Sequence, residues 1–242
     1  MISFIVPAYD EEAMIGRTLM AIDAAGRAVG EPFETIVADD ASSDRTPDIA
    51  RALGAKVVSL NRRQIAAARN AGARAARGDL LVFVDADTTV TASVIGAALD
   101  AVRDGAVGGG CRIGFDEPVP RYGRILEAIG APLYRVLRVA SGCFLFSTRE
   151  AFVAAGGFDE KLLVMEELAM SRALGRQGRF VVLRQSVTTS GRKFRAYSGR
   201  EVLGILWRLL ILGGPAWRRR DGLELWYGQR RADPGVSERR AG

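Results

Sequence analysis

Residues 80–87 read LLVFVDAD: five apolar residues, then two acids around an alanine. A continuous apolar run of this length is typical of a strand buried on both faces of a parallel sheet. Asp85 and Asp87 follow at once, so they lie at the carboxyl end of that strand, where open α/β sheets bind their ligands. The stretch therefore predicts both the fold class and the edge of the sheet where a site would form.

Three other strand-like runs precede this strand, and a segment with helical spacing follows each of the four. The expected strands are Ile2–Val6, Phe33–Ala38 and Lys56–Leu60, and the expected helices cover residues 12–29, 46–53, 64–77 and 91–102. Asp44 or Ser43 is expected to cap the second helix, Gly78 to end the third, and Thr91 or Ser93 to begin the fourth. Repeated strand–helix units predict a parallel sheet with helices on both faces.

The second half of the chain changes character. It begins with a Gly-rich extended segment, Ala106–Phe115, whose Gly108–Gly110 does not fit a dinucleotide fingerprint and indicates close backbone approach in a strand. Helices are expected at 121–139, 150–155, 163–177 and 202–212, and strands at 141–147 and 180–187. We find no internal repeat, so the halves, residues 1–110 and 111–200, are expected to be lobes of one domain, and 201–242 is expected to form an amphipathic helix and basic tail.

The composition excludes several classes of mechanism. The 242 residues include no histidine, which removes imidazole bases, Ser-His triads and histidine-based zinc sites. Cys111 and Cys143 are too few for a disulfide framework and are expected to be small buried residues in a reducing compartment. The net charge is +6, and residues 218–242 carry half of it. That basic end suits either an anionic lipid or polyphosphate surface, or a solvated tail.

Four acidic clusters stand out along the chain: Asp10–Glu12, Asp39–Asp40, Asp85 with Asp87, and Glu166–Glu167. The first three follow predicted parallel strands, whose carboxyl ends meet at one edge, so these acids should converge on one cleft. Converging carboxylates repel one another unless a cation lies among them. A hard divalent ion, held by one or two carboxylates and by substrate phosphates, resolves that conflict.

Three ordered segments together resemble the family 2 glycosyltransferases, inverting enzymes of the GT-A fold. Residues 6–12 (VPAYDEE) resemble V-P-x-[YF]-N-E-E, with Asp10 where asparagine is usual, and residues 37–46 (VADDASSDRT) resemble V-x-D-D-x-S-x-D-x-T. Residues 68–72, 76–79 and 83–87 resemble the stretch that ends in the metal-binding D-x-D. More loosely, residues 156–160 (GGFDE) resemble the start of the acceptor side, Glu166–Glu167 fall where the family has E-D, and residues 189–193 (TSGRK) resemble a T-S-x-R-R/K segment.

The resemblance implies a GT-A fold: a Rossmann-like, mostly parallel sheet with a smaller acceptor-side lobe, in which residues 1–110 bind the donor and 111–200 the acceptor. It also implies inverting transfer of a hexose-type sugar from a nucleoside-diphosphate donor such as a UDP-sugar. It implies that Glu167, or Glu166 if the register shifts by one, is the base, and that Asp87 with Asp85 holds Mg²⁺ or Mn²⁺. The remaining residues would bind the nucleotide sugar: Asp40 with Asp39 at the nucleobase, Pro7, Ala8, Tyr9 and Glu11 at the base and ribose, Ala86 in the D-x-D loop, and Arg69 and Arg192 at the phosphates.

Other interpretations stay open at this point. A metal-dependent nucleotidyltransferase would carry a Gly-rich phosphate loop where Asp10–Glu12 stands, and a degenerate nucleotide-sugar binder would fit the replacement of aspartate by Glu167. A nucleic-acid binder is disfavoured because cleft acids repel phosphate.

Residues 202–220 suit either a membrane interface that admits a lipid-linked acceptor or a cover over the acceptor lobe; a small-molecule acceptor also fits. No secretory or membrane-spanning segment is evident, so the expected location is cytoplasmic, with contact to the inner membrane face as an option.

Overall fold

The computed structural model describes residues 1–116, 119–137, 139–213, 216–218, 220–221, 223 and 227. Its strands are β1 (Ile2–Ala8), β2 (Phe33–Asp40), β3 (Lys56–Leu60), β4 (Leu80–Val84), β5 (Thr88–Thr89), β6 (Ala106–Phe115), β7 (Phe144–Thr148) and β8 (Arg179–Thr189). Its helices are α1 (Ile15–Val29), α2 (Thr46–Ala52), α3 (Ile65–Ala75), α4 (Ala92–Arg103), α5 (Arg121–Leu137), α6 (Arg149–Ala154), α7 (Glu166–Gln177), α8 (Arg192–Ala196) and α9 (Gly199–Leu212), with a 3-10 turn, η1, at Ala216–Arg218.

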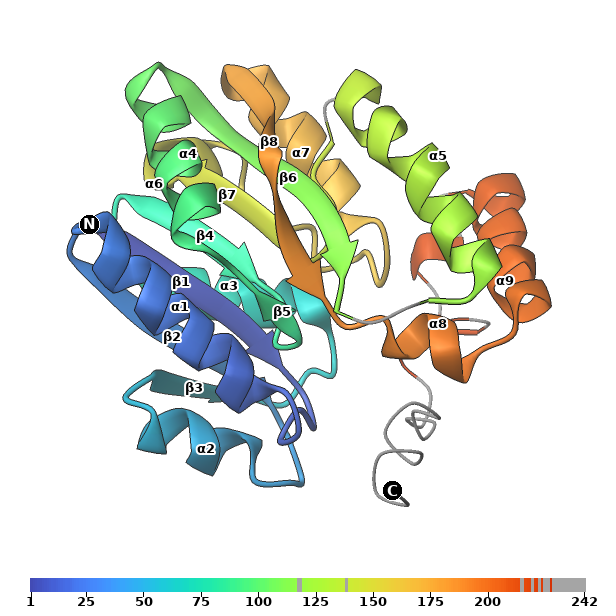
Figure 1. Ribbon diagram of the computed structural model, residues 1–242, viewed down its shortest axis with the longest axis horizontal. Coiled ribbons are helices and arrows are strands. Elements are labelled where there is room, and N and C mark those ends of the chain that lie inside the picture. Colours follow the sequence, from blue (N-terminus) through green and yellow to red (C-terminus); the bar gives the residue numbers. More distant parts are fainter. Residues whose placement is uncertain are drawn as a thin grey trace.

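The described strands form one sheet in the order β3-β2-β1-β4-β7-β6-β8-β5 (Figure 1). The pairs β3–β2, β2–β1 and β1–β4 are parallel, with Ala8 beside Asp39 at the carboxyl end. The expected parallel pairing of the first half and the shared carboxyl edge are therefore confirmed. The acids that follow β1, β2 and β4 start from the same side of the molecule.

The second half continues the same sheet with reversed strands. β7 pairs antiparallel to both β4 and β6, β8 pairs parallel to β6, and the short β5 pairs antiparallel to β8. Close packing explains the glycines of β6, because a Cβ at Gly109 would collide with the Val181 carbonyl oxygen. The reversal brings the end of β8 back to the carboxyl edge of β4, where Thr88 and Thr189 pair.

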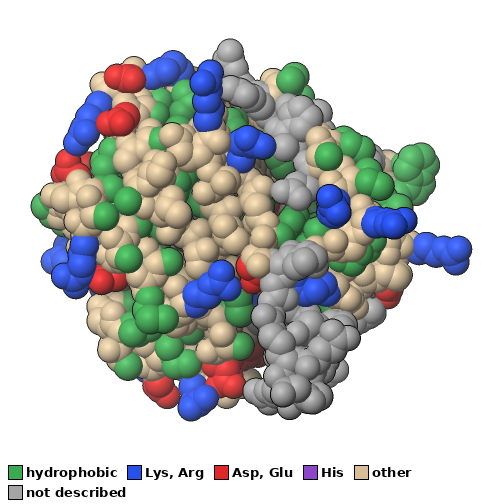
Figure 2. Space-filling model, viewed as in Figure 1, with side chains coloured by type: hydrophobic (Ala, Val, Ile, Leu, Met, Phe, Trp, Pro, Cys, Tyr) green, Lys and Arg blue, Asp and Glu red, His purple; other side chains and the backbone are tan. Residues whose placement is uncertain are grey.

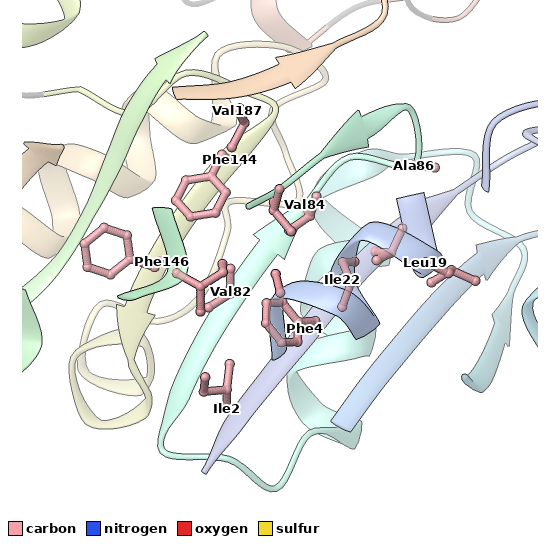
Figure 3. Close-up of a cluster of buried hydrophobic side chains, with 14 of the residues drawn as sticks. Ile2, Phe4, Leu19, Ile22, Val82, Val84, Ala86, Phe144, Phe146 and Val187 are labelled. Atoms are coloured by element: carbon pink, nitrogen blue, oxygen red, sulfur yellow. The ribbon is translucent and has the colours of Figure 1, made fainter. Parts of the chain in front are cut away.

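Each face of the sheet has its own core. Alternate residues of β1 and β4, such as Phe4 and Val82, pack with α1 and α4 (Figure 3). Their neighbours Ile5 and Phe83 point the other way and pack with α3, α6 and α7. Strands buried on both faces produce this alternation, and at about 25 cal/mol per Å² of apolar area it supplies the main stabilisation of the fold.

Several local expectations are corrected by the structure. Arg45 stands at the N-cap position of α2, and its side chain has no acceptor for a cap. Asp44, one residue earlier, does accept from the Thr46 N–H and hydroxyl at the start of the helix, as expected of a capping carboxylate. α3 ends at Ala75, before Gly78. The Thr91 side chain does cap α4, and both cysteines are buried and free.

The C-terminal part also differs in detail from the sequence expectations. α9 ends at Leu212 as expected but begins at Gly199, three residues before the expected start, and Trp217 lies in η1. No hydrophobic pattern in the sequence predicted β5 or α8, which are two and five residues long. Trp226 and nearly all of the basic tail fall outside the described residues. Within those residues, no helix combines the length and the apolar character that a membrane crossing requires.

Candidate functional site

The Asp85-Ala86-Asp87 loop at the end of β4 is fixed by its neighbours. The Thr18 hydroxyl of α1 donates to the Ala86 carbonyl (2.8 Å), and the Ser190 N–H donates to the Asp87 carbonyl (3.1 Å). The Ala86 side chain is buried in the core beside β4 (Figure 3). The loop is therefore anchored through its backbone and its middle side chain, and the two flanking carboxylates keep defined positions.

Arg69 of α3 joins this loop to the start of α7. One terminal nitrogen donates to Glu166 Oε1 (2.8 Å), and the other donates to Asp85 Oδ1 (3.0 Å) and to the Gly142 carbonyl (2.6 Å). The Arg69 side chain is 2% exposed. The sequence suggested that Arg69 meets a phosphate, but the structure places it beneath the site as an internal counter-ion.

The buried carboxylates exceed the charge that Arg69 can balance. Burial raises the pKa of Asp85 to about 6, with Asp87 adding to the effect and Arg69 opposing it. Burial, and then the Glu167 carboxylate, raises the pKa of Glu166 well above its usual range. Burial alone would lower the pKa of Arg69, but Asp85 and Glu166 raise it above its ordinary value, so Arg69 stays charged. Additional positive charge at this edge would relieve the repulsion.

Glu167, the second residue of α7, lies against the backbone of Gly142. Glu167 Oε1 occupies the space that a Cβ at position 142 would need, so a larger residue would displace the carboxylate. Glu167 Oε2 is buried and has no hydrogen-bond partner among the described residues. A buried carboxylate oxygen without a donor is costly, so this atom is placed to accept a hydrogen bond from a bound molecule.

Arg192, at the start of α8, spans two acids on different loops. Its guanidinium contacts Glu11 Oε1 (2.5 Å) in the loop after β1 and Asp87 Oδ2 (3.0 Å) in the loop after β4. Thr189, the last residue of β8, donates its hydroxyl to Asp87 Oδ1 (3.4 Å). Arg192 is 22% exposed, so its charge lies at the surface of the site, unlike that of Arg69.

Asp39 and Asp40 at the end of β2 differ in their surroundings. Asp40 accepts hydrogen bonds from the backbone N–H groups of Arg62, Arg63 and Gln64 at 2.7, 2.9 and 2.7 Å, which fixes the loop before α3. Asp39 is also buried, but its Oδ1 has no partner among the described residues. The family resemblance implied that Asp40 binds the nucleobase. In the structure it is Asp39 whose Oδ1 has no hydrogen-bond donor among the described residues.

Pro7 and Ala8 are the buried last residues of β1, and Tyr9 follows them in a half-buried position. The Arg63 guanidinium carbon lies 3.4 Å from the centroid of the Tyr9 ring, a cation–π contact. Because Asp40 fixes the backbone of Arg63, the end of β2 sets the position of this stacked pair. Ala8, the residue before Tyr9, pairs with Asp39 in the sheet.

The loop after β1 is bound to the loop after β2. Asp10 has a φ of 47°, a left-handed conformation that aspartate tolerates, and its Oδ1 accepts from the Ser43 N–H (2.7 Å). The Glu11 N–H donates to the Thr46 hydroxyl (2.7 Å). This loop holds acids where a nucleotidyltransferase of the kind considered above would hold a Gly-rich phosphate loop.

Several residues of the site were missed by the sequence interpretation. Gly142 supplies both the carbonyl for Arg69 and the space for Glu167, and the Lys193 charge acts on Asp85. Burial, and then the charge of Glu167, raises the pKa of the Tyr134 phenol on α5, so this residue is within electrostatic reach of Glu167. None of these positions belongs to an acidic cluster, and only long-range packing brings them to the site.

Asp85 and Asp87 suit a divalent cation as part of a larger ligand set. Both are carboxylates, the oxygen ligands that Mg²⁺ and Mn²⁺ prefer, and burial raises the pKa of Asp85 although Arg69 lies beside it. Within the described residues, no group of three metal-ligating side chains is found. The chemistry of the residues therefore fits an ion that one or two carboxylates hold together with the phosphates of a ligand.

Comparison with known proteins agrees with this arrangement. Residues 3–154 match the family model described as glycosyl transferase family 2. An undecaprenyl-phosphate 4-deoxy-4-formamido-L-arabinose transferase of Pseudomonas paraeruginosa is 38% identical over 94 residues, which cover 36% of this chain and 28% of the relative. A validoxylamine A glucosyltransferase of Streptomyces hygroscopicus subsp. limoneus is 32% identical over 171 residues, which cover 66% of this chain and 37% of the relative.

The chain spans only about a third of the length of these relatives. Among solved structures, a mannosyltransferase from Pyrobaculum calidifontis in complex with GDP-Man and Mn²⁺ superposes with a TM-score of 0.64. The match covers 90% of this chain and 66% of that structure at 21% identity. A likeness at this identity establishes the shared α/β fold.

Proposed function

The chain belongs to glycosyl transferase family 2, and we propose that it moves one sugar from a nucleoside-diphosphate donor to an acceptor oxygen at the carboxyl edge of β1, β2 and β4. The observation that carries the proposal is the Asp85–Arg69–Glu166 link, which holds the D-x-D loop and the start of α7 together. One side of this link has the acids suited to the leaving diphosphate. The other side has an acid suited to the attacking oxygen.

The donor would bind along the loops after β1 and β2. Asp39 Oδ1 would accept a hydrogen bond from an N–H of the nucleobase, because it is a buried acceptor without a partner among the described residues. The Tyr9–Arg63 pair offers a flat surface at the end of the neighbouring strand β1. Arg192, which is paired with Glu11 and Asp87, would also donate a hydrogen bond to a phosphate when the donor binds.

The diphosphate leaves with developing negative charge, and the site needs a matching cation. Asp87, together with Asp85, would hold Mg²⁺ or Mn²⁺ there. The ion, when bound, supplies electrostatic stabilisation of the leaving phosphates. Since no third protein ligand is found within the described residues, we expect its affinity to depend on the nucleotide.

Glu167 rather than Glu166 is the proposed base. Glu166 forms an internal salt bridge with Arg69 and is only 4% exposed, so an acceptor hydroxyl has little access to it. Burial also raises its pKa. Glu167 has a buried oxygen with no protein partner among the described residues, so that oxygen can accept the proton of an acceptor hydroxyl. Attack from this side, opposite the leaving diphosphate, would invert the anomeric carbon.

The acceptor would bind on the Glu167 side of the site. The relatives act on different classes, as their names say: an undecaprenyl phosphate in one case and validoxylamine A in the other. Tyr134, within electrostatic reach of Glu167, would border the acceptor side. We propose that α5 therefore forms one wall of the acceptor site.

A panel of nucleotide sugars tests the donor first. With Mn²⁺ present, one UDP- or GDP-sugar should raise the melting temperature, because a ligand that binds the folded state stabilises it. Release of the nucleoside diphosphate from that donor should then fall by about 10²–10⁴-fold in Glu167→Gln, the range for loss of a general base. The matched control is Glu150→Gln, an exposed glutamate on α6, which should keep full turnover. No melting shift with any donor, or full turnover in Glu167→Gln, contradicts the proposal.

A further inference from the structure

Two helices at the far end of the sheet expose most of the large apolar side chains that the described residues leave at the surface. Eight of the twelve lie on α5 and α9: Ile125, Ile129, Tyr134, Val136, Leu137, Leu203, Trp207 and Ile211. The other four are scattered: Met1, Met20, Leu53 and Val153. Contiguous exposed apolar surface of this kind marks an interaction site, whereas isolated residues do not.

On each helix three of the exposed residues form one stripe, and Tyr134 and Leu137 of α5 lie outside it. At about 100° per residue, Ile125, Ile129 and Val136 lie within roughly 40° of one another around α5. Leu203, Trp207 and Ile211 follow at intervals of four on α9. The opposite side of α9 carries Val202, which is buried, and Ile205, which packs against Val164 and Leu223. The apolar stripes are therefore extra to the faces that fold the protein.

The two helices are joined into one surface at their N-terminal ends. The Tyr122 hydroxyl of α5 donates to the carbonyls of Phe194 (2.6 Å) and Tyr197 (2.7 Å), just before α9. The Tyr122 ring also packs against Gly199, the first residue of α9. Figure 1 shows α5, α8 and α9 together on the side of the sheet away from β3. We call the exposed faces of α5 and α9 the α5–α9 surface.

The charge on this surface is positive. Its two helices contain five arginines and two glutamates, a net charge of +3. Arg121, Arg124, Arg200 and Arg208 are all exposed. Figure 2 shows Lys or Arg side chains among the hydrophobic ones at this end of the molecule. Two copies placed face to face would bring like charges together, whereas an anionic lipid surface complements them.

We propose that the α5–α9 surface docks on an anionic phospholipid bilayer, with its apolar stripes in the interface and its arginines at the lipid phosphates. Amphipathic helices that lie in an interface have this combination of an apolar face and flanking basic residues, and tryptophan favours that depth. Neither helix needs to cross the bilayer. Tyr134 lies on the side of α5 opposite to the stripe, so docking would place α5 between the bilayer and the acceptor side near Glu167; this consequence rests on the proposed function, but docking does not.

Vesicle flotation with the whole chain and no substrate tests the docking. The chain should bind vesicles of phosphatidylcholine with phosphatidylglycerol, bind pure phosphatidylcholine less, and lose affinity in high salt. The double variant Ile125→Ser, Trp207→Ser, with one change on each helix, should bind at least about tenfold more weakly, since each removes an apolar side chain of the size that supplies most of the partition energy. Met20→Ser, Val153→Ser, equally exposed elsewhere, should bind like the wild type.

A second measurement keeps the proposal testable if the double variant folds poorly. Lipids brominated on their acyl chains should quench the tryptophan fluorescence of the wild type, and Trp207→Phe should lose most of that quenching. Equal binding by the double variant and its control, or absence of quenching at Trp207, overturns the proposal. Failure to bind anionic vesicles also overturns the proposal. In that case light scattering would test whether the α5–α9 surface instead joins two copies of the chain. None of these outcomes depends on sugar transfer.

Discussion

Replacing Asp85 by asparagine should make the folded protein more stable at neutral pH. Burial and the Asp87 carboxylate hold the pKa of Asp85 at about 6, against an ordinary 3.8, although Arg69 lies 3.0 Å away. The surroundings therefore disfavour the charged form even with the arginine present. Asparagine has the same shape, keeps an oxygen for Arg69 and carries no charge, so it removes the penalty and retains the contact.

The magnitude follows from the shift in pKa. A carboxyl whose pKa is raised on folding stabilises the protein fully below the unfolded pKa and loses that contribution as pH rises through the folded pKa. For Asp85 the window runs from 3.8 to about 6. The Asn variant should therefore exceed the wild type by up to about 3 kcal/mol above pH 7 and by only about 0.5 kcal/mol at pH 4. The Asp85 side chain is 28% exposed, so solvent screening makes the larger figure an upper value.

Urea unfolding and thermal melting at pH 8 and pH 4 measure this difference. At about 2–4 °C per kcal/mol for a chain of this size, Asp85→Asn should melt up to about 10 °C higher at pH 8 and close to the wild type at pH 4. Asp100→Asn, on the exposed face of α4, should differ little at either pH. A variant that is less stable than the wild type at pH 8 would refute the reasoning, because the Arg69 pair would then outweigh the burial cost.

Three further predictions concern the same edge of the sheet. Arg69→Met should lower the free energy of unfolding by about 3–5 kcal/mol, since Asp85 and Glu166 lose their buried counter-ion, and Arg69→Lys should recover part of it in urea unfolding; equal stability of all three proteins would exclude the counter-ion role. Asp39→Ala should weaken nucleoside-diphosphate binding at least about tenfold in titration calorimetry with little change in melting temperature, because it removes the Oδ1 acceptor, which has no described protein partner; unchanged affinity would assign the nucleobase elsewhere. Chelation of divalent ions should weaken diphosphate binding by the wild type, and a chelator-insensitive affinity would remove the ion from the account.

The sequence alone predicted the fold where local pattern and topology agree. The apolar run at residues 80–84 and the acids behind the first, second and fourth strands indicated a shared carboxyl edge, and the sheet has that edge. Repetition of strand and helix made this reliable, because parallel strands with helical connections admit few arrangements. Short elements such as β5 and α8 lacked such repetition, and long-range pairing with β8 creates β5.

The candidate site was predictable in its residues but less so in their partners. The motifs named Arg69, Asp39 and Asp40, yet only the folded chain reveals that Arg69 is buried between Asp85 and Glu166. Likewise the backbone N–H groups of residues 62–64 satisfy Asp40 and leave Asp39 with the open acceptor. These contacts join residues 16 to 97 positions apart, which no local pattern encodes.

Titration calorimetry with UDP and GDP, in the presence of Mn²⁺, tests the central claim most directly. The wild type should bind one of the two diphosphates, Glu167→Gln should bind it with the same affinity because Glu167 serves the acceptor, and Asp87→Asn should bind it at least about tenfold more weakly. Failure of the wild type to bind either diphosphate, or equal binding by Asp87→Asn, would contradict the assignment of this sheet edge to a nucleoside-diphosphate donor.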